Sequence, residues 1–132
     1  MSRKSTDTFT YYNRNPRGLK TSADCVARAI SVATGYSWEN TINSITAHAI
    51  KMGRVFNEKE AYGSWLENEG WTKMPQLKKA NNKRYTIKEF QKLHPEGIII
   101  IKVSGHLTVI EDGILYDTWN CERASVGNYW VK

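Results

Sequence analysis

An Asp-Gly dipeptide, Asp112-Gly113, separates two apolar segments of alternating pattern, HLTVI (106–110) and ILYDTW (114–119). Asp-Gly is strongly preferred in two-residue β-hairpin turns, because both turn positions require positive φ angles. Two alternating segments joined by such a turn pair in one defined register, which fixes the face of every side chain. The sequence therefore predicts a β-hairpin over residues 106–119.

Two ionisable side chains, His106 and Asp117, lie near the open end of this hairpin. With a two-residue turn, His106, Asp117 and Trp119 share one face, and His106 and Asp117 become diagonal neighbours that a bent side chain can bridge. A three-residue turn would place Asp117 opposite Leu107, on the other face from His106. We favour the two-residue register, in which Asp117 can hold the imidazole tautomer of His106.

The rest of the chain predicts helices first and strands afterwards. Apolar side chains recur at helical spacing in three segments that end at Gly35, Gly53 and Gly70, and in a shorter segment capped by Thr86. From Gly97 onward the pattern becomes that of strands, over residues 98–103, 106–110, 114–119 and 126–132. This order predicts an α+β fold in which N-terminal helices pack on a C-terminal antiparallel β-sheet.

Capping residues predict where these helices begin. TSAD (21–24) resembles a capping box, which starts the first helix at its Thr or Ser. The second helix should begin after Ser37, and the third should be capped by Asn57. Residues 1–20 are polar and basic and are predicted to be partly irregular, whereas WTKMPQL (71–77) is predicted to be extended.

The bulk composition limits the class of protein. The 132 residues suit a single domain over residues 1–132, and the formal charge of +6 is compatible with an acidic partner. The basic stretch KKANNKR (78–84), followed by Tyr85, could contact phosphates. A solvated loop explains these residues equally well, so a nucleic-acid partner is not favoured.

Location and cofactors are predicted from what the sequence contains. There is no apolar stretch that would act as a secretory signal or span a bilayer, so we predict a cytoplasmic protein with reduced thiols and no membrane partner. Cys25, Cys121 and the histidines lack metal-ligand spacing, and no glycine-rich phosphate loop is present. No metal or cofactor is therefore expected, and the oligomeric state is not predicted.

Cys25 lies in the first turn of the first predicted helix, where unpaired N–H groups and the helix dipole favour a thiolate. The neighbouring Asp24 would oppose this effect if its carboxylate pointed the same way. A buried structural cysteine at position 25 and a structural strand histidine at position 106 are the alternative interpretations of these two residues.

A cysteine at the start of the first long helix, then a histidine on a strand, then an aspartate on the next strand, resembles the papain-like cysteine peptidase superfamily. The layout resembles most its small bacterial and phage members, and the resemblance covers most of residues 13–132. It implies that Cys25 is the nucleophile, His106 the general base and acid, and Asp117 the orienting residue, with Asn120 a weaker candidate for that third role.

The resemblance implies a thiol hydrolase, namely a peptidase, isopeptidase or amidase that forms a thioester with a protein or peptide substrate. Acyl transfer to an acceptor other than water would use the same residues. The alternative is a catalytically weak or inactive papain-like fold that acts as a small basic binding or inhibitor protein for a host protein or a nucleic acid.

One departure from the family concerns the oxyanion hole. Papain-like enzymes place a glutamine about six residues before the cysteine, but Leu19 stands there and no glutamine precedes Cys25. Loss of one oxyanion donor typically costs about a hundred- to a thousandfold in rate. The backbone N–H of Cys25 can supply one donor and Trp119 could line the site. Asn15 is the first candidate for the other donor, with Asn13, Thr21 and Ser22 as further candidates.

Overall fold

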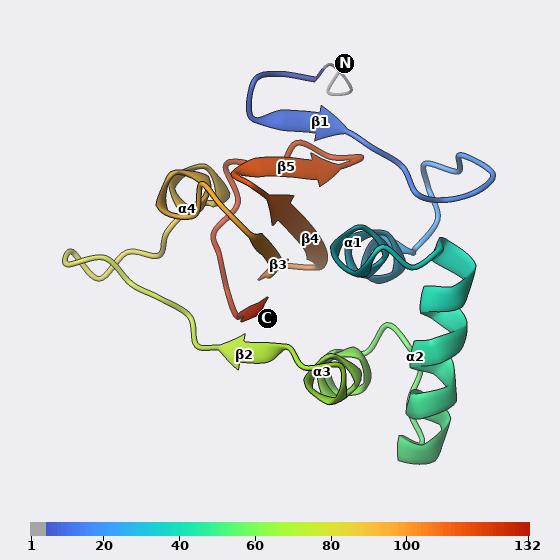
Figure 1. The fold of residues 1–132 in the computed structure, drawn as a ribbon. Coiled ribbons are helices and arrows are strands. Elements are labelled where there is room, and N and C mark those ends of the chain that lie inside the picture. Colours follow the sequence, from blue (N-terminus) through green and yellow to red (C-terminus); the bar gives the residue numbers. More distant parts are fainter. Residues whose placement is uncertain (1–4) are drawn as a thin grey trace.

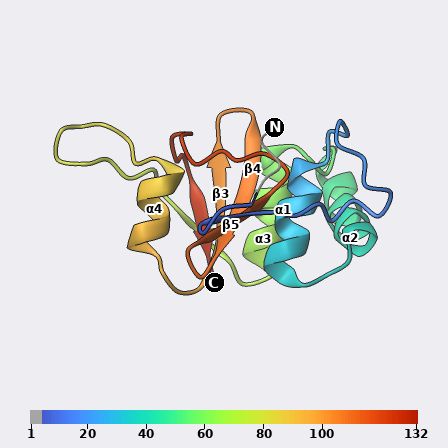
Figure 2. The same ribbon diagram turned by 90° about the horizontal axis from the view of Figure 1, so that it is seen from above.

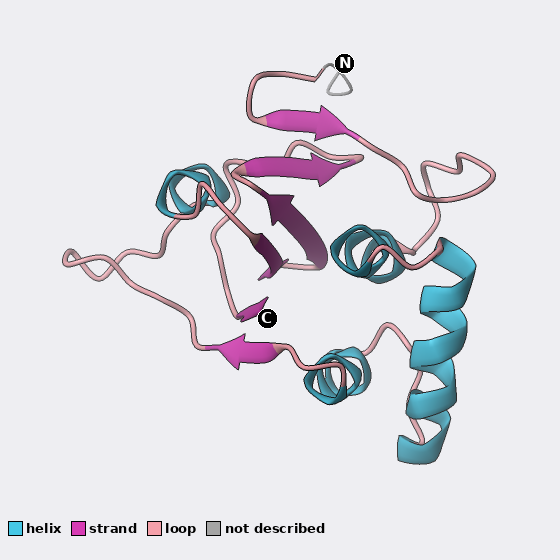
Figure 3. Ribbon diagram, viewed as in Figure 1, coloured by secondary structure: helices cyan, strands magenta, loops and turns pink. Residues whose placement is uncertain are grey.

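The computed structural model describes residues 5–132 and contains one six-stranded β-sheet with helices on both faces (Figure 1). The strands follow one another across the sheet in the order β1-β5-β4-β3-β6-β2. Helices and strands together form the mixed α+β class that the sequence predicts (Figure 3). The strands are β1 Phe9–Tyr11, β2 Thr72–Met74, β3 Ile98–Val103, β4 His106–Glu111, β5 Ile114–Asp117 and β6 Tyr129–Val131.

The hairpin of β4 and β5 has the two-residue turn that its sequence predicts. Ile110 pairs with Leu115 across the ladder. Asp112 and Gly113 adopt φ angles of 52° and 78°, and positive values at both positions are what a type I′ turn requires. The predicted register is therefore confirmed, and the three-residue alternative is wrong.

In the described part of the chain, four helices pack around the sheet. Helices α1 and α3 lie against one face with α2 outside them, and α4 covers the other face (Figures 1 and 2). The loop between β2 and α4 extends away from the body of the molecule (Figure 2). Within residues 5–132, no helix combines the length and the apolar character needed to cross a bilayer. The helices are α1 Cys25–Thr34, α2 Trp38–Met52, α3 Lys59–Asn68 and α4 Ile87–Leu93.

The hydrophobic core is divided into two clusters by the sheet. One cluster holds Ile30 of α1 and Leu66 of α3 against Ile100 of β3. The other holds Phe90 of α4 against Ile101. Because β3 is covered on both faces, Ile100 is buried on one side and Ile101 on the other, which explains the run of isoleucines in this strand.

Two short edge strands, β1 on one side of the sheet and β2 on the other, make the sheet larger and less regular than predicted. β1 lies within the segment predicted to be irregular, and it runs parallel to β5 with Phe9 paired to Leu115. The sheet is consequently mixed and not purely antiparallel. A three-residue strand is too short to show a period in the sequence, and its position is stabilised by the complete burial of Phe9. β2 arises in the segment predicted to be extended and pairs antiparallel with β6.

The predicted caps of α2 and α4 are confirmed. The Ser37 side chain accepts a hydrogen bond from the Asn40 N–H at 3.0 Å. Thr86 and Glu89 form a reciprocal capping box at the start of α4. Both motifs satisfy backbone N–H groups in the first turn with side chains close in sequence, which is why the sequence alone could place them.

Candidate active site

Cys25 is the first residue of α1, so the predicted helix start at Thr21 or Ser22 is wrong. Asp24 occupies the N-cap position but makes no side-chain cap hydrogen bond. Its carboxylate forms an ion pair with Arg28 one turn later instead. The capping-box prediction fails because tertiary partners compete for the same carboxylate.

The Asp24 carboxylate is buried among donors that compensate its charge. Besides Arg28, it accepts hydrogen bonds from the Asn15 side-chain amide at 3.1 Å and from the Trp38 indole N–H at 2.8 Å. The contacts with Asn15 and Trp38 hold the start of α1 against the N-terminal loop and α2. The positive charge of Arg28 also offsets the unfavourable effect of Asp24 on a thiolate at Cys25.

His106 and Asp117 meet across the hairpin as the register requires. The Nε2 atom of His106 lies 2.7 Å from the Oδ2 atom of Asp117. Thr108, directly opposite Asp117 in the extended register, donates its hydroxyl to the same oxygen at 2.5 Å. The backbone N–H of Thr118 donates to Oδ1 at 2.6 Å. Asp117 is only 5% exposed, so its carboxylate is held in one orientation toward the imidazole.

Cys25 and His106 lie side by side and each shifts the pKa of the other, although they approach from different faces of β4. Helix α1 packs on the face of β4 that carries Leu107 and Val109, whereas His106 belongs to the opposite face. The two meet because each is the first residue of its element, at the end of the strand. Since Asp117 holds Nε2, the other ring nitrogen, Nδ1, is the one available to the thiol.

This arrangement moves the pKa values of the two groups in opposite directions. Burial alone would raise the pKa of Cys25, but hydrogen bonds from His106 and the Leu107 backbone, with the charges of His106 and Arg28, bring it below the ordinary cysteine value. Burial would lower the pKa of His106, yet hydrogen bonds and charges from Asp117 and Cys25 raise it to about 9. Both shifts act in the direction that favours a thiolate–imidazolium pair.

Cys121 presents the opposite chemistry. It is 1% exposed, and burial together with the nearby Asp117 charge raises the pKa of its thiol to about 12. Its sulfur, with donor atoms of His106 and Asp117, forms a group whose atoms all lie within 4.8 Å of one another. A metal ion would need the Cys121 thiolate and the Nε2 lone pair, so the existing His106–Asp117 hydrogen bond would have to break.

Trp119 lies beside the imidazole, as its predicted position on the hairpin face suggests. The centroids of the Trp119 and His106 rings are 5.1 Å apart in an edge-to-face arrangement. The indole remains 46% exposed. Trp119 therefore limits the access of water to one side of His106 while leaving the thiol side open.

Asn120 and Asn15 make their hydrogen bonds away from the thiol. The Asn120 side-chain oxygen accepts from the Glu122 N–H at 3.1 Å. The Asn15 oxygen accepts from the Arg17 N–H at 2.9 Å, while its amide donates to Asp24. Asn15 organises the loop before α1 and does not line the hollow at Cys25.

A hollow of about 220 Å³ opens beside the thiol. It contains one side-chain amide, that of Asn57, which the sequence analysis assigned to the cap of α3. The N-cap of α3 is Glu58 instead, so that assignment is wrong and Asn57 is free to face this hollow. The lining residues are Cys25, Val26, Asn57, Lys59, Tyr62, Lys102, Gly105 and His106.

Sequence reasoning missed Asn57, Lys59 and Lys102 as neighbours of Cys25. No local pattern indicates them, because α3 and the end of β3 approach α1 only through tertiary packing. Thr108 was accessible to sequence reasoning, since the two-residue register already puts it opposite Asp117. Its hydroxyl is the donor that this register makes available to the carboxylate.

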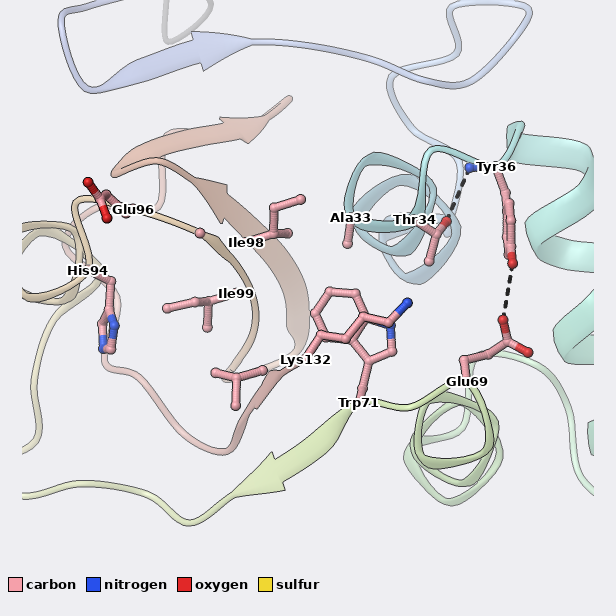
Figure 4. A pocket seen from close by; sticks show the side chains of 12 residues that line it. Ala33, Thr34, Tyr36, Glu69, Trp71, His94, Glu96, Ile98, Ile99 and Lys132 are labelled. Carbon is pink, nitrogen blue, oxygen red and sulfur yellow. Dashed lines mark hydrogen bonds between the residues drawn. The ribbon is translucent and has the colours of Figure 1, made fainter.

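A second hollow, of about 510 Å³, lies at the opposite end of α1 (Figure 4). Ala33 and Thr34 contribute to it from the last turn of that helix, and Trp71 and Lys132 line its lower side in the view shown. It shares no lining residue with the hollow at Cys25. The ionisable groups around the thiol therefore define a separate site.

Comparisons of the chain with protein-family models, with curated proteins and with solved structures found no match.

Proposed function

We propose that this chain is a papain-like thiol hydrolase, acting as a peptidase, isopeptidase or amidase through Cys25, His106 and Asp117. The observation that carries the proposal is that Cys25 lies beside His106, whose ring is hydrogen-bonded to Asp117. A lowered cysteine pKa beside a raised histidine pKa is the polarisation that a nucleophilic thiol requires. The α+β layout, with the cysteine beginning the first helix, supports the same proposal.

The chemistry follows from the positions of the protons. The Cys25 thiolate attacks the substrate carbonyl carbon, and an S–C bond forms while the carbonyl oxygen becomes an oxyanion. The carbon–nitrogen bond then breaks as the imidazolium of His106 gives its proton to the leaving amine, which leaves a thioester. His106 next takes a proton from water, whose oxygen displaces the sulfur. The acid product leaves, and the thiolate–imidazolium pair is restored.

We assign stabilisation of the oxyanion to the first turn of α1 and to the hollow beside it. The backbone N–H of Cys25, in the first turn of the helix, has no carbonyl four residues earlier within the helix and supplies one donor. The second oxyanion donor is the side-chain amide of Asn57, because Asn57 is the residue with an amide side chain among those that line the hollow. It would replace the family's glutamine from a segment that follows the cysteine in sequence.

Iodoacetamide provides the direct test of this proposal. At about pH 6.5 the reagent is expected to alkylate Cys25 at least about tenfold faster than Cys121, because only Cys25 has a stabilised thiolate. The rate at each thiol is measured by quenching the reaction at intervals and quantifying the modified peptides by mass spectrometry. In concentrated urea the two rates should converge. Equal, slow modification of both thiols in the folded chain would contradict the proposal.

A change at Asp117 should alter the pH dependence of this alkylation. Asp117→Asn removes a charge that raises the pKa of His106, so the imidazolium is lost at lower pH than about 9. Without that cation the pKa of Cys25 rises, and each unit of rise lowers the thiolate fraction about tenfold at pH values below it. The alkylation rate of Cys25, followed from about pH 5 to pH 10, should therefore shift to higher pH.

Asp112→Asn is the matched control for this variant. Asn-Gly is as favourable as Asp-Gly in the type I′ turn, so the hairpin is preserved. Its pH profile should coincide with that of the unmodified chain. An Asp117→Asn profile that also coincides would show that the carboxylate does not set the protonation of His106.

A further inference from the structure

A larger hollow adjoins the one at Cys25. Lys59 and Lys102 line both. The neighbouring hollow measures about 580 Å³, and Gln76, Arg84 and Asn128 also contribute to it. A molecule whose carbonyl reached the thiol would therefore extend directly along these side chains. We call the combined hollow the basic groove.

The cations of the basic groove are held by neutral acceptors. The Lys59 ammonium donates to the Asn128 side-chain oxygen at 2.6 Å. The Lys102 ammonium donates to the Val103 carbonyl at 2.6 Å. Both contacts fix the position of the ammonium group without neutralising its charge.

Carboxylates are absent from this groove over residues 5–132. None of the described residues that line either hollow is Asp or Glu. Ion pairs elsewhere in the described chain engage Arg28, Arg54, Lys79 and Lys88, but no ion pair engages Lys59, Lys102 or Arg84. Burial, with the charges of Lys73 and Lys102, lowers the pKa of Lys59, while the charge of Glu60 acts in the opposite direction.

We propose that the basic groove binds Asp or Glu side chains of a peptide substrate, adjacent to the bond that Cys25 attacks. This inference rests on the proposed function, since the groove is contiguous with the thiol and the anion must belong to the molecule that supplies the carbonyl. A single-stranded nucleic acid is less suitable, because such ligands need aromatic side chains for base stacking. The residues that line the larger hollow include no aromatic side chain.

The substrate charge can be tested with two pairs of irreversible peptide probes. One pair is acetyl-Glu-Glu-Gly-chloromethyl ketone and its Gln-Gln counterpart, and the other is chloroacetyl-Gly-Glu-Glu-amide and its Gln-Gln counterpart. The pairs extend to opposite sides of the reacting carbon, and each probe alkylates a thiolate with loss of chloride. In at least one pair the Glu probe should modify Cys25 about tenfold faster at low ionic strength, and added salt should reduce this preference.

Variants then assign the preference to the groove. The double variant Lys59→Gln, Lys102→Gln should bring the Glu-to-Gln rate ratio close to one, whereas Lys92→Gln, an exposed lysine on α4, should leave it unchanged. Equal rates for Glu and Gln probes in both pairs on the unmodified chain would overturn this inference, and that comparison depends on no variant folding. Rapid but charge-independent modification of Cys25 would leave the proposed function standing. Failure of Cys25 to react faster than Cys121 with iodoacetamide would contradict the proposed function itself.

Discussion

Replacing His106 with glutamine is expected to abolish the burst of p-nitrophenol that the unmodified chain should release from p-nitrophenyl acetate. The burst reports acetylation of Cys25, and the steady phase that follows reports hydrolysis of the thioester. Glutamine can donate a hydrogen bond but cannot carry the proton that His106 exchanges with Cys25 and with the attacking water. The turnover rate should fall about a thousandfold, within the range that general acid–base catalysis typically contributes.

His48→Gln is the matched control for this substitution. His48 lies on α2, where its Nε2 atom is 2.8 Å from the Ser64 hydroxyl, away from the thiol. The burst and turnover of this variant should stay close to those of the unmodified chain. Both reactions are followed by p-nitrophenol absorbance after rapid mixing, and the acetylated peptide is located by mass spectrometry. If the His106→Gln chain retained the full burst, His106 would not take part in the acetylation of Cys25.

Replacing Ile30 with alanine is expected to lower the free energy of unfolding by about 2–5 kcal/mol, the usual cost of truncating a buried isoleucine. Ile30 is fully buried between α1 and the sheet, so the missing atoms leave a cavity that rigid strands cannot close. The change is read from urea unfolding followed by circular dichroism, as a shift of the midpoint at unchanged slope.

The same substitution at Ile50 provides the comparison. Ile50 lies on α2 and is 70% exposed, so its truncation removes little buried surface and should change stability by no more than about 0.5 kcal/mol. Equal losses at both positions would mean that α1 is not packed on the sheet as described. The packing of α1 on the sheet would then not explain why Cys25 lies beside His106.

The predictions that the structure confirms depend on residues close in sequence. The Asp112-Gly113 turn determines the β4–β5 register because its φ angles are properties of the turn itself. The Thr86–Glu89 capping box and the Ser37 cap satisfy N–H groups within one helical turn.

The predictions that failed depend on contacts outside the helix turn in which the motif lies. Asp24 could cap α1 locally, but Arg28, Asn15 and Trp38 together bind its carboxylate more effectively. Asn57 has the right side chain for a cap, yet α3 begins one residue later, with Glu58 as the N-cap. The strand β1 is stabilised by the burial of Phe9 against elements about 100 residues away, which a three-residue pattern cannot reveal.

The candidate site also combines contacts that are local in sequence with contacts that depend on the tertiary structure. The sequence by itself predicted that His106 and Asp117 are diagonal neighbours on one face, because a two-residue turn and the alternation of a strand place them there. Only the tertiary structure decided that Cys25 reaches His106 from the opposite face of β4, at the ends of both elements. It also decided that Asn57, Lys59 and Lys102 surround the thiol. These contacts join segments that meet through burial of apolar surface, which is non-directional and leaves no local signature in the sequence.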